Sequence, residues 1–222
     1  MDKISKNRLD LSSEQSKVNL AQHWNNVYTK SAQEKLGWHE TDLSPTLQLI
    51  NKTNLNKAAP IIIIGAGSTI LVDKLVATKY TNIIATDISN VALNNLKERL
   101  NTQAVKFITD NLTSPTTLAA IAPVSLWIDR AVLHFFTDTK DKNTYFNLLK
   151  SKLAKGGYAL FAQFNLMGAH KCSGLPVHRY SKKMLANELG NDFELVESFD
   201  YTYSMPSGDT RPYVYALFKK LS

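Results

Sequence analysis

The sequence predicts an α/β fold: a doubly wound sheet of seven strands, mostly parallel with an antiparallel C-terminal hairpin, and helices on both faces. Short apolar, β-branched runs alternate with helical patterns over the first five strands, and strands connected through helices in this way form a parallel sheet. The last two apolar segments, residues 193–203 and 213–220, are joined by a short turn containing Pro206 and Gly208. Strands joined by so short a turn pair antiparallel.

Composition places the chain among globular proteins of ordinary size. It has 222 residues, of which 44% are hydrophobic, enough for one domain with a sizeable core. The single cysteine, Cys172, excludes an intramolecular disulfide and fits a reducing compartment. Residues 1–19 contain no apolar segment of a signal peptide, and no apolar run approaches the length of a membrane span. We therefore expect a cytoplasmic protein with no membrane partner. The oligomeric state stays open, with a monomer favoured.

The net charge of +7 raises the question of nucleic-acid binding. The basic residues are mostly lysines, and they are scattered over predicted helix surfaces without interleaved aromatic residues. A nucleic-acid interface is expected to concentrate such charge in a stripe or patch. The distribution therefore disfavours a nucleic-acid partner.

The N-terminal part divides into a tail and a helical segment. Residues 1–16 are polar, with nothing to bury, and are predicted to be disordered. Residues 17–222 are predicted to form one domain, whose first part, residues 17–58, is a helical cap. An amphipathic helix with an aromatic face begins at Val18. A second helix is predicted to begin with Ser44 as its N-cap and Pro45 at its first helical position.

The central stretch of the chain predicts a nucleoside-binding βαβ unit. The run Ile61–Ile64 reads as a strand buried on both faces, and Gly65-Ala66-Gly67 follows at its end. Glycines there let the backbone turn sharply and approach a ligand. A helix is predicted from Ser68 or Thr69, and the next strand ends in Asp87. A carboxylate at this point of a βαβ unit can accept hydrogen bonds from the hydroxyls of a ribose.

The third glycine of the dinucleotide fingerprint is missing, with Ile70 in its place. That glycine permits the close helix–strand packing that brings a pyrophosphate onto the helix N-terminus. Its absence disfavours NAD. It favours a nucleoside cofactor without a pyrophosphate, such as S-adenosylmethionine.

The rest of the chain continues the alternation of strands and helices. The predicted elements are a helix over 91–100, a strand over 104–110, a brief helix over 118–122, a strand over 124–129, a helix over 144–153, a strand over 158–164, a loop over 165–179 and a helix over 181–189.

Polar residues follow successive predicted strands. Because ligands of open α/β sheets bind beyond the carboxyl ends of the strands, Gly65–Gly67, Asp87, Asp110 and Asp129 are expected to converge on one crevice. Asp110 is suited to accept from an adenine amino group, with Asn111 and Leu112 supplying backbone groups and an apolar face. An aspartate at a strand end is also a common helix cap, so each one alone is weak evidence.

Taken together, the order of elements resembles the class I S-adenosylmethionine-dependent methyltransferases, which have a Rossmann-like fold. The resemblance covers residues 18–218 and includes the glycine loop, Asp87 and Asp110. Two local segments are similar to thiopurine methyltransferase-like enzymes. They are Leu126-Trp127-Ile128-Asp129-Arg130-Ala131, and His23-Trp24-Asn25 with Gly37-Trp38-His39-Glu40.

The resemblance implies S-adenosylmethionine as cofactor and S-adenosylhomocysteine as product. It implies that Trp24 and Trp38 close over the cofactor. The cofactor contacts that it implies are Gly65, Ala66, Gly67, Asp87, Ile88, Asp110, Asn111, Leu112 and Asp129. The chain departs from the family at Ile63, where members usually have an acid that helps to bind the methionine portion.

The candidates for groups around the transferred methyl are Asp129, Arg130 and His134. Arg130 is suited to hold an anionic substrate group or to pair with a surface acid. His134 is suited to act as a base, or to be a buried or capping histidine. Cys172, in the loop after the fifth strand, is a substrate contact or an inert thiol. The spacing of Cys172 with His170 and His178 matches no zinc pattern, so no metal is predicted.

These observations predict an S-adenosylmethionine-dependent methyltransferase acting on a small-molecule heteroatom nucleophile, with a thiol favoured. Two alternatives remain open: a protein-lysine methyltransferase, and a non-catalytic protein that binds S-adenosylmethionine, which the departure at Ile63 motivates. A dehydrogenase is disfavoured by Ile70 and by the antiparallel ending.

Overall fold

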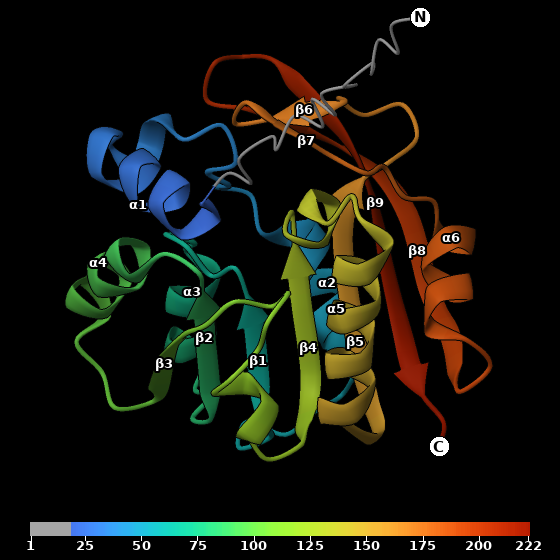
Figure 1. Ribbon diagram of the computed structural model, residues 1–222. Coiled ribbons are helices and arrows are strands. Elements are labelled where there is room, and N and C mark those ends of the chain that lie inside the picture. The colour runs from blue at the N-terminus through green and yellow to red at the C-terminus, as the bar shows by residue number, and fades with distance from the viewer. Residues whose placement is uncertain (1–18) are drawn as a thin grey trace, which may run out of the picture.

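A computed structural model describes residues 19–222 of the chain, and the predicted disordered tail, residues 1–16, lies outside the described residues. The centre of the molecule is a seven-stranded sheet with the strand order β3-β2-β1-β4-β5-β9-β8 (Figure 1). Its strands are β1 (Ile61–Ile64), β2 (Ile83–Asp87), β3 (Val105–Thr109), β4 (Val124–Arg130), β5 (Leu153–Phe164), β8 (Phe193–Ser204) and β9 (Thr210–Lys220).

The pairing of the strands confirms the predicted topology. β1 pairs in parallel with β2 and β4, β2 with β3, and β4 with β5. β9 runs antiparallel to both β5 and β8. The strand order turns back at β1, between β2 and β4, and this reversal is where ligands of open α/β sheets bind.

Helices cover both faces of the sheet, as the alternating pattern predicts. Ile61 and Ile63 of β1 belong to one hydrophobic cluster, and Ile62 and Ile64 to the other, because successive strand residues point to opposite faces. The first cluster includes residues of α2, α3 and α4, and the second includes residues of α5 and α6. The bounds of these helices are α2 (Ser44–Lys52), α3 (Leu71–Ala77), α4 (Asn90–Leu100), α5 (Thr139–Lys152) and α6 (Lys182–Leu189).

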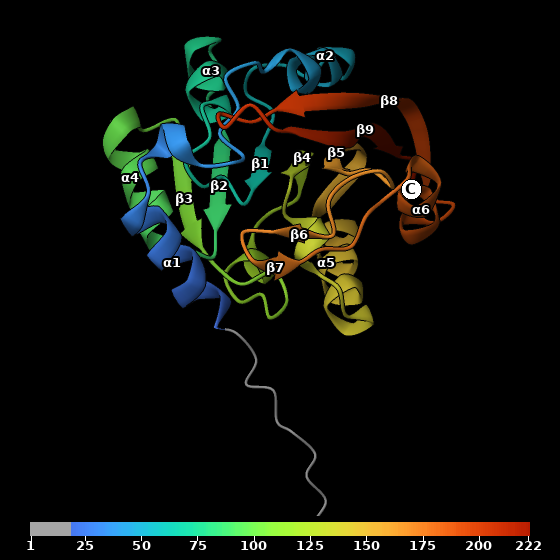
Figure 2. The same ribbon diagram turned by 90° about the horizontal axis from the view of Figure 1, so that it is seen from above.

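Two segments lie above the carboxyl ends of the parallel strands (Figures 1 and 2). One is helix α1 (Leu20–Lys30), which lies beside α4 and is fixed there by the Asn25 side-chain oxygen, which accepts from the Ser89 hydroxyl at 2.7 Å. The other is a short antiparallel hairpin, β6 (Lys171–Cys172) and β7 (Leu175–Pro176). The sequence predicts only a loop over residues 165–179, because two-residue strands leave no periodicity to detect.

Several helix starts differ from the prediction. Helix α5 begins at Thr139 and not at residue 144, and the predicted start of the first helix, Val18, lies outside the described residues. Ser44 is the first residue of α2 rather than its N-cap, and its N–H donates instead to the Asp42 carboxylate at 2.9 Å. Helix α3 begins at Leu71 and not at Ser68 or Thr69, because the glycine loop continues through a turn whose Thr69 hydroxyl accepts from the Leu71 N–H at 3.1 Å.

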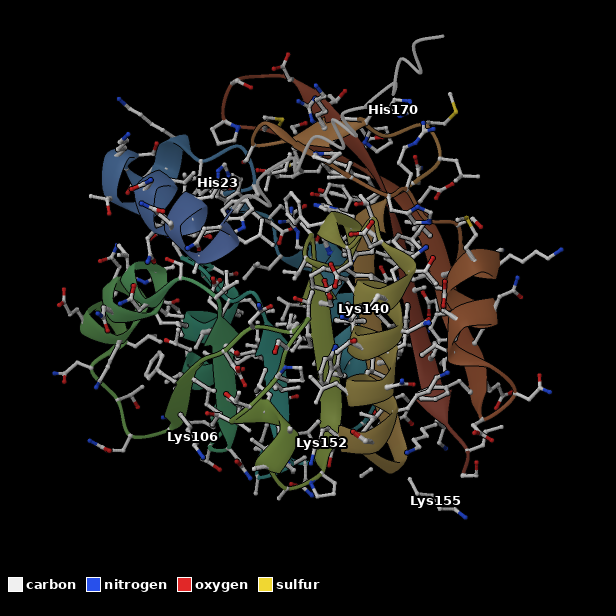
Figure 3. All side chains as sticks on the ribbon, in the orientation of Figure 1. His23, Lys106, Lys140, Lys152, Lys155 and His170 are labelled. Carbon is white, nitrogen blue, oxygen red and sulfur yellow. The ribbon has the colours of Figure 1, made fainter. Side chains whose placement is uncertain are left out.

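Three short 3-10 helices complete the chain: η1 (Gln33–Lys35), η2 (Leu118–Ala120) and η3 (Leu133–Phe135). Within residues 19–222, no helix is both long and apolar enough to cross a membrane. Lys106, Lys152 and Lys155 lie on separate elements at the end of the sheet opposite α1 (Figure 3). These three lysines therefore lie away from the crevice at the carboxyl ends of the strands.

Candidate functional site

A pocket opens where the carboxyl ends of β1, β2 and β4 meet α1 and the segment after it. We call it the aromatic pocket. Its lining residues are Leu20, Trp24, Tyr28, Trp38, Gly65, Thr86, Asp87, Ile88, Asp110, Asn111, Leu112, Arg130, Ala131, Val132, Phe135, Phe136 and Cys172. The lining brings together nine of the predicted site residues: Trp24, Trp38, Gly65, Asp87, Ile88, Asp110, Asn111, Leu112 and Arg130.

The glycine loop after β1 forms the floor between β1 and β2. Gly65 and Gly67 have φ values of 56° and 49°, in the left-handed region that side chains rarely adopt. A Cβ at Gly65 would also collide with the Val132 side chain, and one at Gly67 with the Tyr28 hydroxyl. Arg99 on α4 fixes the following turn by donating to the Thr69 carbonyl at 2.7 Å. The two glycines are therefore required both by backbone conformation and by close packing.

Asp87 ends β2 and is 8% exposed. One carboxylate oxygen accepts the Gly67 N–H at 2.9 Å, and the other accepts the Ser89 N–H at 2.8 Å. Burial raises the pKa of Asp87 to about 6, although these backbone N–H groups oppose the shift. Each oxygen retains a second lone pair, so the carboxylate can still accept hydroxyl donors from a ligand in the pocket.

Asp110 lies at the pocket, but its carboxylate is directed into its own loop. It accepts the N–H of Asn111 at 2.8 Å, of Thr116 at 3.0 Å and of Leu118 at 2.8 Å. These bonds hold the segment after β3 in place. Asp110 therefore shapes the wall formed with Asn111 and Leu112, and most of its accepting capacity is occupied before any ligand binds.

Aromatic side chains from α1 and the following segment cover the pocket. The Trp24 ring lies 5.4 Å from Trp38 and 5.1 Å from Phe135, in edge-to-face arrangements. Tyr28 lies 6.0 Å from Trp38. Such contacts stabilise each other and exclude water from the space beneath them. The sequence singles out the two tryptophans, and Tyr28 and Phe135 join them only through the fold.

The structure does not support Asp129 as a base or a cofactor contact. It is fully buried and does not line the pocket. Its carboxylate accepts the Tyr145 hydroxyl at 2.6 Å, the Gln163 amide at 2.7 Å and the N–H of Val132 at 3.1 Å. Burial raises the pKa of Asp129, and the Tyr145 and Gln163 hydrogen bonds oppose this. Asp129 instead fixes the turn that presents Val132 and the residues beyond it.

The structure likewise does not support His134 as a base. It is fully buried and lines neither this pocket nor the neighbouring one described below. Its ring packs 4.5 Å from Phe135 and 4.6 Å from Phe164. Burial, followed by the nearby Arg130 charge, lowers the pKa of His134 to about 3. So weakly basic a group cannot take a proton from an acceptor at neutral pH.

A second pocket adjoins the first on the α3 side of the glycine loop, and we call it the ion-pair pocket. Its lining residues are Tyr28, Trp38, His39, Glu40, Ile63, Ile64, Gly65, Ala66, Ser68, Thr69, Leu71, Ile128 and Arg130. Glu40 and Arg130 meet there, with Arg130 Nε 3.0 Å from Glu40 Oε2. Arg130 also stacks over the rings of Tyr203 and Tyr213, at 4.9 and 5.2 Å. Sequence reasoning does not identify Glu40 as a site residue.

Cys172 is half-buried at the edge of the aromatic pocket, on the β6–β7 hairpin. Burial raises the pKa of its thiol, so at neutral pH it is a poor nucleophile. Within residues 19–222, no group of three or more histidine, cysteine or acidic residues is placed to hold a metal ion.

No protein family model and no curated protein matches this sequence. Among solved structures, the chain is similar to an S-adenosylmethionine-dependent methyltransferase from Anabaena variabilis, with a TM-score of 0.73 at 15% identity over 90% of this chain and 93% of that one. It is also similar to the N-methyltransferase NodS from Bradyrhizobium japonicum in complex with S-adenosyl-L-homocysteine. That TM-score is 0.69 at 14% identity, over 92% of this chain and 100% of that one.

A third similar structure was solved in work on the conversion of a disulfide bond into a thioacetal group during echinomycin biosynthesis. Its TM-score is 0.70 at 13% identity, over 90% of this chain and 93% of that one. At these identities the likeness concerns the fold. The chain has the Rossmann-like fold of S-adenosylmethionine-dependent methyltransferases.

Proposed function

We propose that this protein is an S-adenosylmethionine-dependent methyltransferase that acts on a small-molecule heteroatom nucleophile, with a thiol favoured. The observation that carries the proposal is Asp87, whose buried carboxylate lines the aromatic pocket directly beside the glycine loop. A ribose hydroxyl pair is the ligand group that this arrangement suits.

The residues of the site fit the cofactor. The Gly65 backbone lines both the aromatic pocket and the ion-pair pocket, so main-chain atoms of the glycine loop face the space where a ligand would bind. Ile88, Leu112 and the ring of Phe136 provide apolar surface in the same pocket, which suits an adenine ring. When bound, S-adenosylmethionine supplies a methyl group on a positively charged sulfur. The protein's part is to align the acceptor with that methyl and to exclude water.

The lining of the aromatic pocket supports an acceptor that needs little help in losing a proton. Within residues 19–222 this lining contains no histidine and no lysine, and its acids are Asp87 and Asp110. A thiol ionises without a strong base, whereas a protonated amine requires one. An acceptor lysine on a protein would be favoured by further acids at the pocket, and none is present in this lining.

The proposal is tested by calorimetric titration with S-adenosylhomocysteine, followed by methyl-transfer assays with a panel of small thiols, amines and phenols. We expect micromolar binding and turnover of a thiol. Binding without turnover of any acceptor would indicate a non-catalytic binder, and labelling of proteins in a lysate without labelling of thiols would indicate a protein methyltransferase. Failure to bind S-adenosylhomocysteine would refute the proposal as a whole.

Binding is expected to depend on pH through Asp87. Its pKa is raised by burial to about 6, so the carboxylate is ionised above this pH and protonated below it. A protonated carboxyl accepts hydroxyl donors poorly, so affinity for S-adenosylhomocysteine should fall as the pH is lowered through this range. By linkage, lowering the pH from about 8 to about 5 should weaken binding about tenfold. The Tyr28 hydroxyl, which faces Asp87 from α1, stays neutral because burial raises its pKa.

Calorimetric titrations across this pH range, on the unaltered protein and on Asp87→Asn, measure the effect. The variant should bind weakly with little pH dependence. A pH dependence of the same size in both proteins would assign the effect to another group.

A further inference from the structure

Strand β1 brings no charged side chain to the ion-pair pocket. Ile63, at the position where an acid would be expected to help bind a methionine ammonium, is apolar and 4% exposed. A ligand with a zwitterionic end could not be held there by β1. The charged side chains of this pocket come instead from the N-terminal segment, as Glu40, and from the end of β4, as Arg130.

Glu40 and Arg130 are both largely removed from solvent, with side-chain exposures of 6% and 14%. The Tyr215 hydroxyl donates to Glu40 Oε1 at 3.2 Å, and Arg130 Nη1 donates to the Trp38 carbonyl at 3.1 Å. Among residues 19–222, Arg130 Nη2 has no hydrogen-bond partner, and the Nε–H is not directed at Glu40 although the two groups are close. A buried guanidinium with open donors is costly unless an anion completes it.

The position of Glu40 is fixed by contacts on both sides of it. The Tyr203 hydroxyl donates to the His39 carbonyl at 2.6 Å, and the Tyr201 hydroxyl donates to the Asp42 carboxylate at 3.0 Å. These tyrosines lie on β8, at the far side of the sheet from β2. The C-terminal hairpin therefore fixes the segment that carries Glu40, and Glu40 lines the same pocket as Gly65 and Ala66 of the glycine loop.

We propose that Glu40 and Arg130 together bind the α-amino acid end of the cofactor. Glu40 accepts from the ammonium group, and the open Nη2 donors of Arg130 bind the carboxylate. Glu40 thereby replaces the acid that β1 lacks at Ile63. This inference rests on the proposed function, because it assigns a further part of the same cofactor to the ion-pair pocket.

The test compares two ligands by calorimetric titration. S-adenosylhomocysteine has the amino acid end, and 5′-methylthioadenosine shares its adenosine and sulfur but lacks that end. The unaltered protein should bind S-adenosylhomocysteine more tightly. In Glu40→Gln we expect binding of S-adenosylhomocysteine to weaken about tenfold to a hundredfold, the size of one charged hydrogen bond, with binding of 5′-methylthioadenosine unchanged.

Glu194→Gln is the matched control, because this substitution makes the same chemical change at an exposed residue of β8. It should leave both affinities unchanged. If Glu40→Gln binds both ligands as tightly as the unaltered protein does, the ion pair is structural only, and this result would overturn the inference while leaving the proposed function intact. If the unaltered protein binds neither ligand, the proposed function fails and the inference fails with it.

A second variant covers the case in which Glu40→Gln disturbs the whole site and weakens both ligands. Tyr215→Phe removes the hydrogen bond that orients Glu40 and keeps every charge in place. Tyr215→Phe should weaken binding of S-adenosylhomocysteine by a smaller factor than Glu40→Gln does, and should leave binding of 5′-methylthioadenosine unchanged. An equal effect on both ligands, or no effect on either, would overturn the inference.

Discussion

Replacing Asp87 by alanine is expected to weaken binding of S-adenosylhomocysteine by about a hundredfold, the cost of losing an ionised acceptor of two hydroxyl groups. Asp87 is buried at the end of β2 beside the glycine loop, and its carboxylate lines the aromatic pocket. No neighbouring side chain can take its place, because the Asp110 carboxylate is already occupied by the backbone of its own loop.

Calorimetric titration of Asp87→Ala measures this effect, and a thermal melt monitored by circular dichroism checks that the variant is folded. The matched control is Asp200→Ala, which removes the same charge from an exposed position on β8 and should bind as the unaltered protein does. Equal affinities of Asp87→Ala and Asp200→Ala would show that β2 does not hold the ribose, and would move the search for the cofactor away from the aromatic pocket.

The largest loss of stability is expected from Asp129→Ala. The Asp129 carboxylate is the shared acceptor of the Tyr145 hydroxyl, the Gln163 amide and backbone N–H groups after β4, all of them buried. The Trp127 indole in turn donates to the Tyr145 hydroxyl at 3.0 Å. Removing the carboxylate leaves several buried donors without a partner, so the free energy of unfolding should fall by about 3–5 kcal/mol.

Chemical denaturation with urea measures this loss, with Asp200→Ala as the surface control expected to change stability by no more than about 0.5 kcal/mol. Asp129→Asn keeps one accepting oxygen, so its free energy of unfolding should lie between those of Asp129→Ala and Asp200→Ala. A similar stability of Asp129→Ala and Asp200→Ala would mean that water or a rearranged side chain satisfies these donors.

The architecture was predictable because short stretches of the sequence specify it. The apolar run Ile61–Ile64, the glycines after it and the directly connected final strands specify a parallel sheet with an antiparallel edge. Element boundaries were less predictable. The glycine loop extends to Ile70 before α3 begins, because the Thr69 hydroxyl accepts the Leu71 N–H and holds a turn that helical periodicity does not reveal.

The sequence alone determined the position of the crevice, because a glycine loop and the acids after parallel strands must lie at the same edge of a sheet. The sequence did not determine which of these acids face the pocket and which are bonded to other parts of the protein. Asp87 and Asp129 both end central strands, but only Asp87 lines the pocket, because the partners of Asp129 come from α5 and β5.

The tertiary structure alone decided the role of Glu40. Its partner Tyr215 is 175 residues away in the chain. Arg130 donates a hydrogen bond to the Trp38 carbonyl, in the same segment as Glu40 and 92 residues from Arg130. No local pattern marks a surface-type residue such as glutamate as buried and paired. Only the folding of the N-terminal segment against β4 and the C-terminal hairpin brings these charges together, because burial and ion pairing depend on contacts between segments that are distant in sequence.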